Sequence, residues 1–240
     1  MKKLIILVAA LFLADTAHAQ LELDVRRIRP GTDSMVMYLV RGADTTRAGE
    51  ISDEIAVARE GGSSTLRRVH ASASSVTGMD IDTLVDDAAT LRPIRARGAG
   101  AMGSVALDFA AGRITGWART DDGDSVAVDT TPEGVFYNSS TLDLVIRAAP
   151  LRDGWTAEIP VYLSTRGEVV PIRAAVAASE TVDGVACWRV EVDFTGMPVT
   201  FWIEKDSRAM ARQVMRMAPG VEVLFRRAGP APGRARAETR

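Results

Sequence analysis

The stretch ACWRVEVDF, which runs from Ala186 to Phe194, decides the fold class. Apolar and polar residues alternate along it, so Trp188 and Val190 share one face with Phe194, while Cys187 lies on the other. Because successive side chains of a β-strand point to opposite sides of a sheet, this pattern predicts a strand with one buried face. By the same parity Trp188 is expected to be deeply buried and Cys187 to face solvent.

The same alternation recurs along most of the chain, in short runs separated by Gly, Asp, Pro and Ser. Tight turn signals such as Asp183-Gly184 and Pro219-Gly220 separate neighbouring runs, which favours sequential antiparallel pairing over βαβ units. The expected strands are residues 35–41, 49–59, 65–72, 91–97, 104–109, 113–119, 125–129, 157–163, 169–177, 186–194, 199–203, 210–217 and 221–227.

One segment has helical spacing instead. Leu142, Val145 and Ile146 recur at intervals of three and four between Ser139 and Ala149, and a proline follows at once. This spacing predicts one short amphipathic helix that lies against the sheet. A second helix over residues 80–89 is a further possibility that the pattern leaves open.

The N-terminus has the three parts of a secretory signal peptide. Two lysines precede an uncharged apolar run over residues 4–14, and Ala17-His18-Ala19 supplies the small residues of a cleavage site. We expect residues 1–19 to be removed and the mature protein to be periplasmic or secreted. Residues 20–227 are expected to form a single β-rich domain, and residues 228–240 a disordered tail, because the tail is rich in Gly and Pro and lacks apolar periodicity.

The composition excludes several classes of function. A formal net charge of −2 with mixed signs argues against a nucleic-acid partner. The single cysteine, Cys187, rules out an internal disulfide. No paired-cysteine or His-Glu-x-x-His motif is present, so we expect no metal and no cofactor. No later segment is apolar enough to predict a membrane span.

Catalytic candidates are few. His70 is the only histidine beyond the expected cleavage site, and Cys187 has Arg189 two residues on as its one activating neighbour. No Gly-x-Ser-x-Gly motif accompanies them. A hydrolase that uses His70 or Cys187 is therefore less favoured than the two non-catalytic functions described below.

A family resemblance lies in the last third. Its motifs are SETVDGVACWRV over residues 179–190, VTFWIEKDSR over 199–208, Arg212, and GVEV over 220–223. The helical segment followed by LRDGWTAEIPVY, up to Tyr162, also fits. This order resembles uncharacterised periplasmic proteins related to the lipoprotein-sorting carriers, over about residues 142–225.

The resemblance implies a curved antiparallel sheet, a half-barrel or open barrel, with one or two short helices packed on its concave face. It also implies an apolar hollow, because the well-studied relatives carry lipoprotein acyl chains across the periplasm, and it brings no catalytic residues. This chain departs from them in having little helix to close the hollow.

We therefore expect a non-catalytic binding or carrier protein for an apolar or lipid-like ligand. The alternative is a structural or interaction protein of the envelope with a protein partner and no small-molecule ligand. The expected ligand contacts are inward-facing apolar residues of the last strands, with the helix as a lid: Trp188, Val190, Phe194, Phe201, Ile203, Leu142, Val145 and Ile146.

Overall fold

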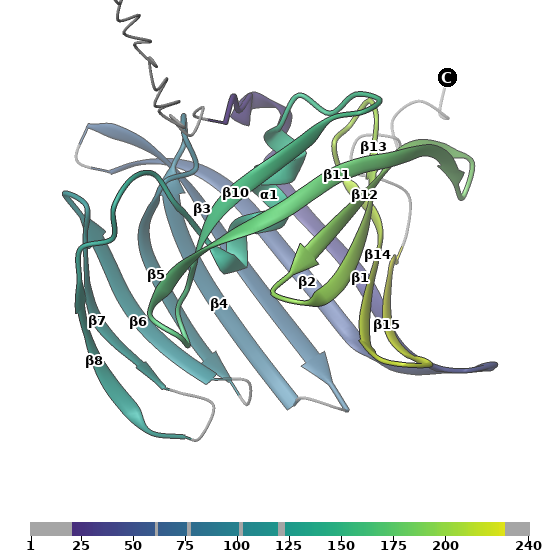
Figure 1. Cartoon of the computed structure of the whole chain (residues 1–240), viewed down its shortest axis with the longest axis horizontal. Helices are drawn as coiled ribbons and strands as arrows, with labels where there is room; N and C mark the ends of the chain where they lie inside the picture. Colours follow the sequence, from purple (N-terminus) through teal and green to yellow (C-terminus); the bar gives the residue numbers. More distant parts are fainter. Residues whose placement is uncertain (1–20, 61, 76–77, 101–102, 120–122, 229–240) are drawn as a thin grey trace, which may run out of the picture.

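The computed structural model describes residues 21–228 except 61, 76–77, 101–102 and 120–122 (Figure 1). The expected signal peptide over residues 1–19 lies outside the described residues, as does the expected tail beyond Ala228. The described chain forms one 15-stranded sheet in the order β8-β7-β6-β5-β4-β3-β2-β1-β15-β14-β13-β12-β11-β10-β9. Neighbouring strands pair antiparallel, except for the short parallel pair of β9 with β10.

The first half of the described chain contains the 3₁₀ helix η1 (Val25–Arg27) and eight strands: β1 (Gly31–Arg41), β2 (Asp44–Glu60), β3 (Ser63–Ser74), β4 (Gly78–Asp87), β5 (Pro93–Gly100), β6 (Gly103–Ala110), β7 (Arg113–Arg119) and β8 (Ser125–Thr130). The second half of the described chain begins with β9 (Tyr137–Asn138), the 3₁₀ helix η2 (Ser139–Thr141) and the α-helix α1 (Leu142–Ala148). The remaining strands are β10 (Thr156–Leu163), β11 (Glu168–Val182), β12 (Val185–Phe194), β13 (Met197–Glu204), β14 (Met210–Ala218) and β15 (Val221–Arg227).

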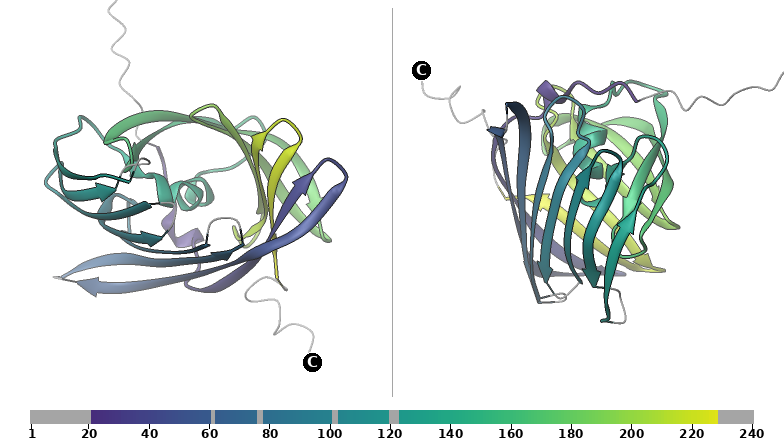
Figure 2. Two further views of the ribbon diagram at one scale, coloured as in Figure 1. Left: turned by 90° about the horizontal axis from the view of Figure 1, so that it is seen from below. Right: turned by 90° about the vertical axis from the view of Figure 1, so that its left-hand side faces the viewer.

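The sheet curves until its two halves face each other, with α1 between them (Figure 2). Its edge strands β8 and β9 are not hydrogen-bonded to one another, so the barrel is open. Near this seam, rings of Phe109, Phe136 and Tyr162 pack with centroids 6.1 to 6.3 Å apart. The predicted fold class, a curved mainly β sheet with a short helix on its concave face, is confirmed.

Antiparallel pairing gives the barrel two different ends. The turns β1–β2, β3–β4, β5–β6, β7–β8, β10–β11, β12–β13 and β14–β15 lie at one end, which we call the mouth end. The turns β2–β3, β4–β5, β6–β7, β11–β12 and β13–β14 lie at the other, the closed end. There Asp24, just before η1, donates its backbone N–H to Ala148 at the end of α1, over 2.9 Å.

The helix fills the closed half of the barrel. Asn138 caps η2 by accepting a 2.8 Å hydrogen bond from the Ser140 backbone N–H. Leu144, Val145 and Ile146 of α1 are fully buried in the main core cluster, which the inner faces of β10 to β13 complete. The same cluster extends along β10, β12 and β13 as far as Leu163, Val192 and Val199.

Three expectations are wrong. Residues 80–89 form no helix: Gly78–Asp87 is strand β4. Cys187 is buried rather than exposed, because Val182 and Ala211 cover it in a small apolar cluster on the outer face. Trp188 does lie on the core side, but it is only half-buried, and the Lys205 Nζ atom lies 3.8 Å from the centroid of its ring.

Candidate binding cavity

The space between α1 and the mouth end is a cavity with two adjoining chambers. The outer chamber has a volume of about 460 Å³ and extends to the mouth-end turns at Gly103, Ser164 and Thr195. The inner chamber has a volume of about 310 Å³ and reaches α1 at Leu142. The two share Ile51, His70, Asp82, Ser139, Ser140, Phe194 and Phe225, so they form one continuous site. Both volumes fall in the range of ligand pockets.

One wall of the cavity is apolar and rich in methionine. It is built mainly from inner-face residues of β1 and β12 to β15, which parity brings to the same side of the sheet. Methionine is flexible and polarisable, so such a wall adapts to ligands of different shape. Its members are Met35, Phe194, Met197, Val199, Phe201, Met210, Met215 and Phe225 in the inner chamber, with Met37 in the outer one.

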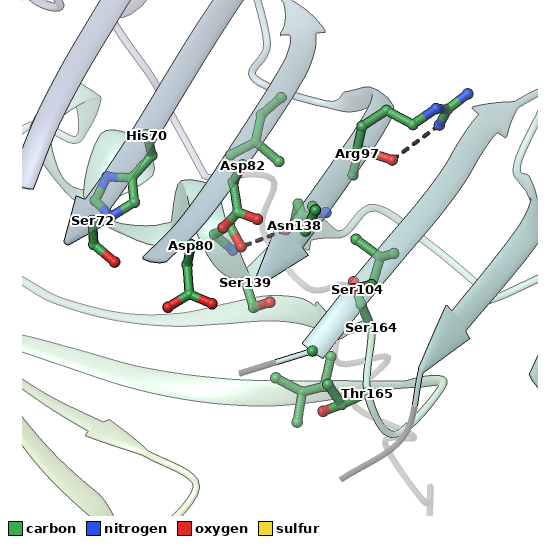
Figure 3. A pocket seen from close by; sticks show the side chains of 18 of the residues that line it. His70, Ser72, Asp80, Asp82, Arg97, Ser104, Asn138, Ser139, Ser164 and Thr165 are labelled. Atoms are coloured by element: carbon green, nitrogen blue, oxygen red, sulfur yellow. Dashed lines mark hydrogen bonds between the residues drawn. The ribbon is translucent and has the colours of Figure 1, made fainter. Parts of the chain in front are cut away.

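The opposite wall is polar (Figure 3). Asp80 and Asp82 of β4 line the outer chamber. Their carboxylates face Gly100 and Gly98 of the neighbouring strand β5, and the absence of a side chain at these two glycines provides the space for them. A Cβ atom at either glycine would collide with the facing carboxylate. Burial raises the pKa of Asp82, and the nearby His70 only partly offsets this effect.

A buried ion network fixes α1 to the sheet beside the inner chamber. The Arg68 side chain, 6% exposed, donates from Nε to Asp53 Oδ1 over 2.6 Å and from Nη1 to Asp143 Oδ1 over 2.6 Å. Its Nη1 also donates to the Ser140 carbonyl over 2.9 Å. Burial would raise the pKa of Asp53, but Arg68 and then His70 outweigh it and hold that pKa well below its usual range.

The eight predicted ligand contacts divide into three groups. Leu142, Phe194 and Phe201 line the inner chamber, and Phe194 lines the outer chamber as well. The four residues Val190, Ile203, Val145 and Ile146 are fully buried in the core between α1 and the sheet. Trp188 lines neither chamber. A ligand-contact role for the first group stays a prediction.

The two catalytic candidates lie apart. His70 lines both chambers, and its Nδ1 atom is 3.4 Å from Asp53 Oδ1. Cys187 lines neither chamber. Burial, and then the Glu204 carboxylate, raise the pKa of the Cys187 thiol to about 11, which leaves it protonated and a weak nucleophile.

Sequence reasoning missed most of the lining. The methionines Met197 and Met215 lie on inner faces by parity and could have been found from it. The positions of Asp80 and Asp82 could not be found in this way, because charged residues in a strand are normally assigned to the solvent-exposed face.

The described part of the chain contains no group of three or more His, Cys, Asp or Glu side chains that could hold a metal ion. It also contains no helix that is long and apolar enough to cross a membrane.

Comparison with solved structures gives distant matches. A β-barrel-like protein of the DUF1849 domain of unknown function from Brucella abortus aligns with a TM-score of 0.45 and 10% identity, over 83% of this chain and 97% of that one. A putative outer membrane lipoprotein-sorting protein domain from Vibrio parahaemolyticus aligns with a TM-score of 0.25 and 9% identity, over 82% and 83% of the two chains. No curated protein matches. A family model described as a protein of unknown function, DUF3108, matches residues 35–224. The chain therefore belongs to the DUF3108 family.

Proposed function

We propose that this protein is a non-catalytic carrier of the cell envelope that holds the acyl chain of a lipid-like ligand in the barrel cavity. The observation that carries the proposal is the apolar wall of the inner chamber, which is formed mainly by aromatic and methionine side chains. These side chains border open volume, although they belong to the core cluster that contains α1 or pack against it. The resemblance of the last third to lipoprotein-sorting carriers supports the same class of ligand.

The energetics favour a chain-like apolar ligand. Each CH₂ group that moves from water into such a chamber gains about 0.8 kcal/mol. Ten such groups would supply about 8 kcal/mol, enough for micromolar affinity only if the costs of association are small or are met by further contacts. The charges of the Arg68 network do not oppose this, because Arg68 is already paired with Asp53 and Asp143.

The test is titration of the protein with a fluorescent fatty acid. We expect saturable binding by the wild type and at least tenfold weaker binding by Phe194→Asp, which places a charge between the two chambers. Val57→Asp is the matched control, because Val57 is 55% exposed and lines neither chamber. Absence of saturable binding by the wild type would favour an interaction protein without a small-molecule ligand.

The hydrolase hypothesis keeps one supporting observation, the His70–Asp53 contact inside the cavity. Arg68, however, makes the shorter contacts to the same carboxylate, so Asp53 is committed to an ion pair. A His70→Ala variant distinguishes the carrier from the hydrolase. We expect this variant to keep acyl-probe binding. An esterase activity of the wild type that is lost in His70→Ala would support the hydrolase instead.

A further inference from the structure

The exposed large apolar side chains gather at one end of the barrel. Among the described residues six such side chains are exposed, and five of them lie within four residues of a mouth-end turn. Their exposed fractions range from 42% for Trp117 to 67% for Met79. The sixth, Val57, lies near the closed end of β2. We call the five the apolar rim: Met79, Ile81, Trp117, Val126 and Met217.

Two strands that carry rim residues, β4 and β14, also line the cavity. On β4, Met79 and Ile81 alternate with Asp80 and Asp82, so the outward residues belong to the rim and the inward ones line the outer chamber. On β14, Met217 lies at a register shift between Arg216 and Ala218, two residues after Met215 of the inner chamber. These strand ends lie at the lower edge of the barrel in Figure 1, away from α1.

Two of the mouth-end turns carry a basic side chain beside an acidic one. Arg166 lies 4.0 Å from Glu168 at the β10–β11 turn, and Arg216 lies 3.1 Å from Glu222 at the β14–β15 turn. An anionic surface therefore has no unpaired basic cluster to engage at these two turns. What the rim offers is apolar side chains, including a tryptophan, a residue type that favours the interface of a bilayer.

We propose that the apolar rim docks on the surface of a phospholipid bilayer, with the mouth of the cavity turned toward the lipid. This inference rests on the proposed function, because an acyl chain that leaves the cavity through water exposes every CH₂ group on the way. Docking lets the chain pass between two apolar environments. Single exposed apolar side chains are ordinary surface, but five around one cavity mouth form the pattern expected of a contact site.

The test is co-sedimentation with vesicles of pure phosphatidylcholine. The mature wild-type protein should bind them equally at low and at high salt, since the contact is apolar. The double variant Met79→Asp/Met217→Asp should lower the bound fraction at least fivefold. Val57→Asp should leave it unchanged, and it is a matched control because Val57 and Met217 are both 55% exposed.

Three results would overturn the docking proposal: no binding to these vesicles, an equal loss in Val57→Asp, or self-association that the rim variant abolishes, which would make a second copy the occupant. Thermal unfolding of each variant confirms that it is folded. The acyl-probe titration in solution separates this inference from the proposed function. If the wild type and the rim variant both bind the probe but neither binds vesicles, the carrier stands and the docking fails. If the wild type binds vesicles but no probe, the carrier fails.

Discussion

At the scale of single residues, the cavity depends on charges that are buried together. Arg68 joins Asp53 of β2 to Asp143 of α1, and its removal leaves two carboxylates without their cation inside the barrel. We expect Arg68→Ala to cost about 3–5 kcal/mol of unfolding free energy, as broken buried pairs do. Urea denaturation measures it.

The control for this prediction is Arg216→Ala. Arg216 pairs with Glu222 at the surface, where the two side chains are 55% and 36% exposed. Such exposed pairs contribute about 0–1 kcal/mol. Equal costs in the two variants would contradict the role assigned to the buried network.

Asp86 gives a prediction with a defined pH dependence. It is 1% exposed, and its Oδ2 atom has no hydrogen-bond donor among the described residues. Burial raises its pKa well above the usual value, although Arg68 acts in the opposite direction. Because the folded pKa is the higher one, stability declines as pH rises from the unfolded pKa, about 4, up through the folded pKa.

Asp86→Asn should remove this decline and stabilise the protein at neutral pH by about 1–3 kcal/mol, the scale of a buried polar group without its partner. Thermal unfolding between pH 4 and pH 8 is the measurement. The decline should persist in Asp108→Asn, which changes a carboxylate that is 55% exposed. A wild-type protein with no decline over this range would show that Asp86 is not held in the state described.

At the scale of elements, α1 divides the barrel into core and cavity. Leu144 is fully buried in the main core cluster. Leu144→Ala should therefore cost about 2–5 kcal/mol, whereas Val57→Ala, at an exposed site, should stay within about 0.5 kcal/mol. Chemical denaturation compares the two. A small effect of Leu144→Ala would mean that the helix is not the anchor of the closed half.

The sequence predicted most elements because period-2 alternation marks strands with one buried face. It placed the helix within one residue of the observed η2 and α1, over Ser139–Ala148. It missed β4, because Asp80, Asp82 and Asp86 put polar residues on the inner face and broke the alternation. Parity assigned Cys187 to the correct face, but it does not reveal that a second apolar cluster covers that face.

The binding site was predictable only in part for a related reason. An inward apolar side chain looks the same in sequence whether it meets α1 or open volume. Val190 and Ile203 meet α1 and its neighbours, whereas Phe194 and Phe201 border the cavity. Whether an inward side chain packs in the core or borders the cavity depends on how far α1 extends along the sheet. The three-dimensional structure shows this, because the sheet extends beyond α1 toward the mouth end.

At the scale of the whole molecule, the open barrel combines a rigid closed half with a hollow mouth half. The closed half holds α1 in place through packing and the Arg68 network. The mouth half has the adaptable methionine wall, the acidic wall of Asp80 and Asp82, and the apolar rim. This division suits a protein that takes up and releases a chain-like ligand at one end.

The central claim is that an acyl-chain ligand occupies this cavity, and native mass spectrometry of protein isolated from its own cell envelope tests it most directly. We expect a non-covalent adduct of lipid mass on the wild type, which is retained in Val57→Asp and lost in Phe194→Asp. A wild-type protein that carries no adduct, or an adduct retained equally by Phe194→Asp, would contradict it.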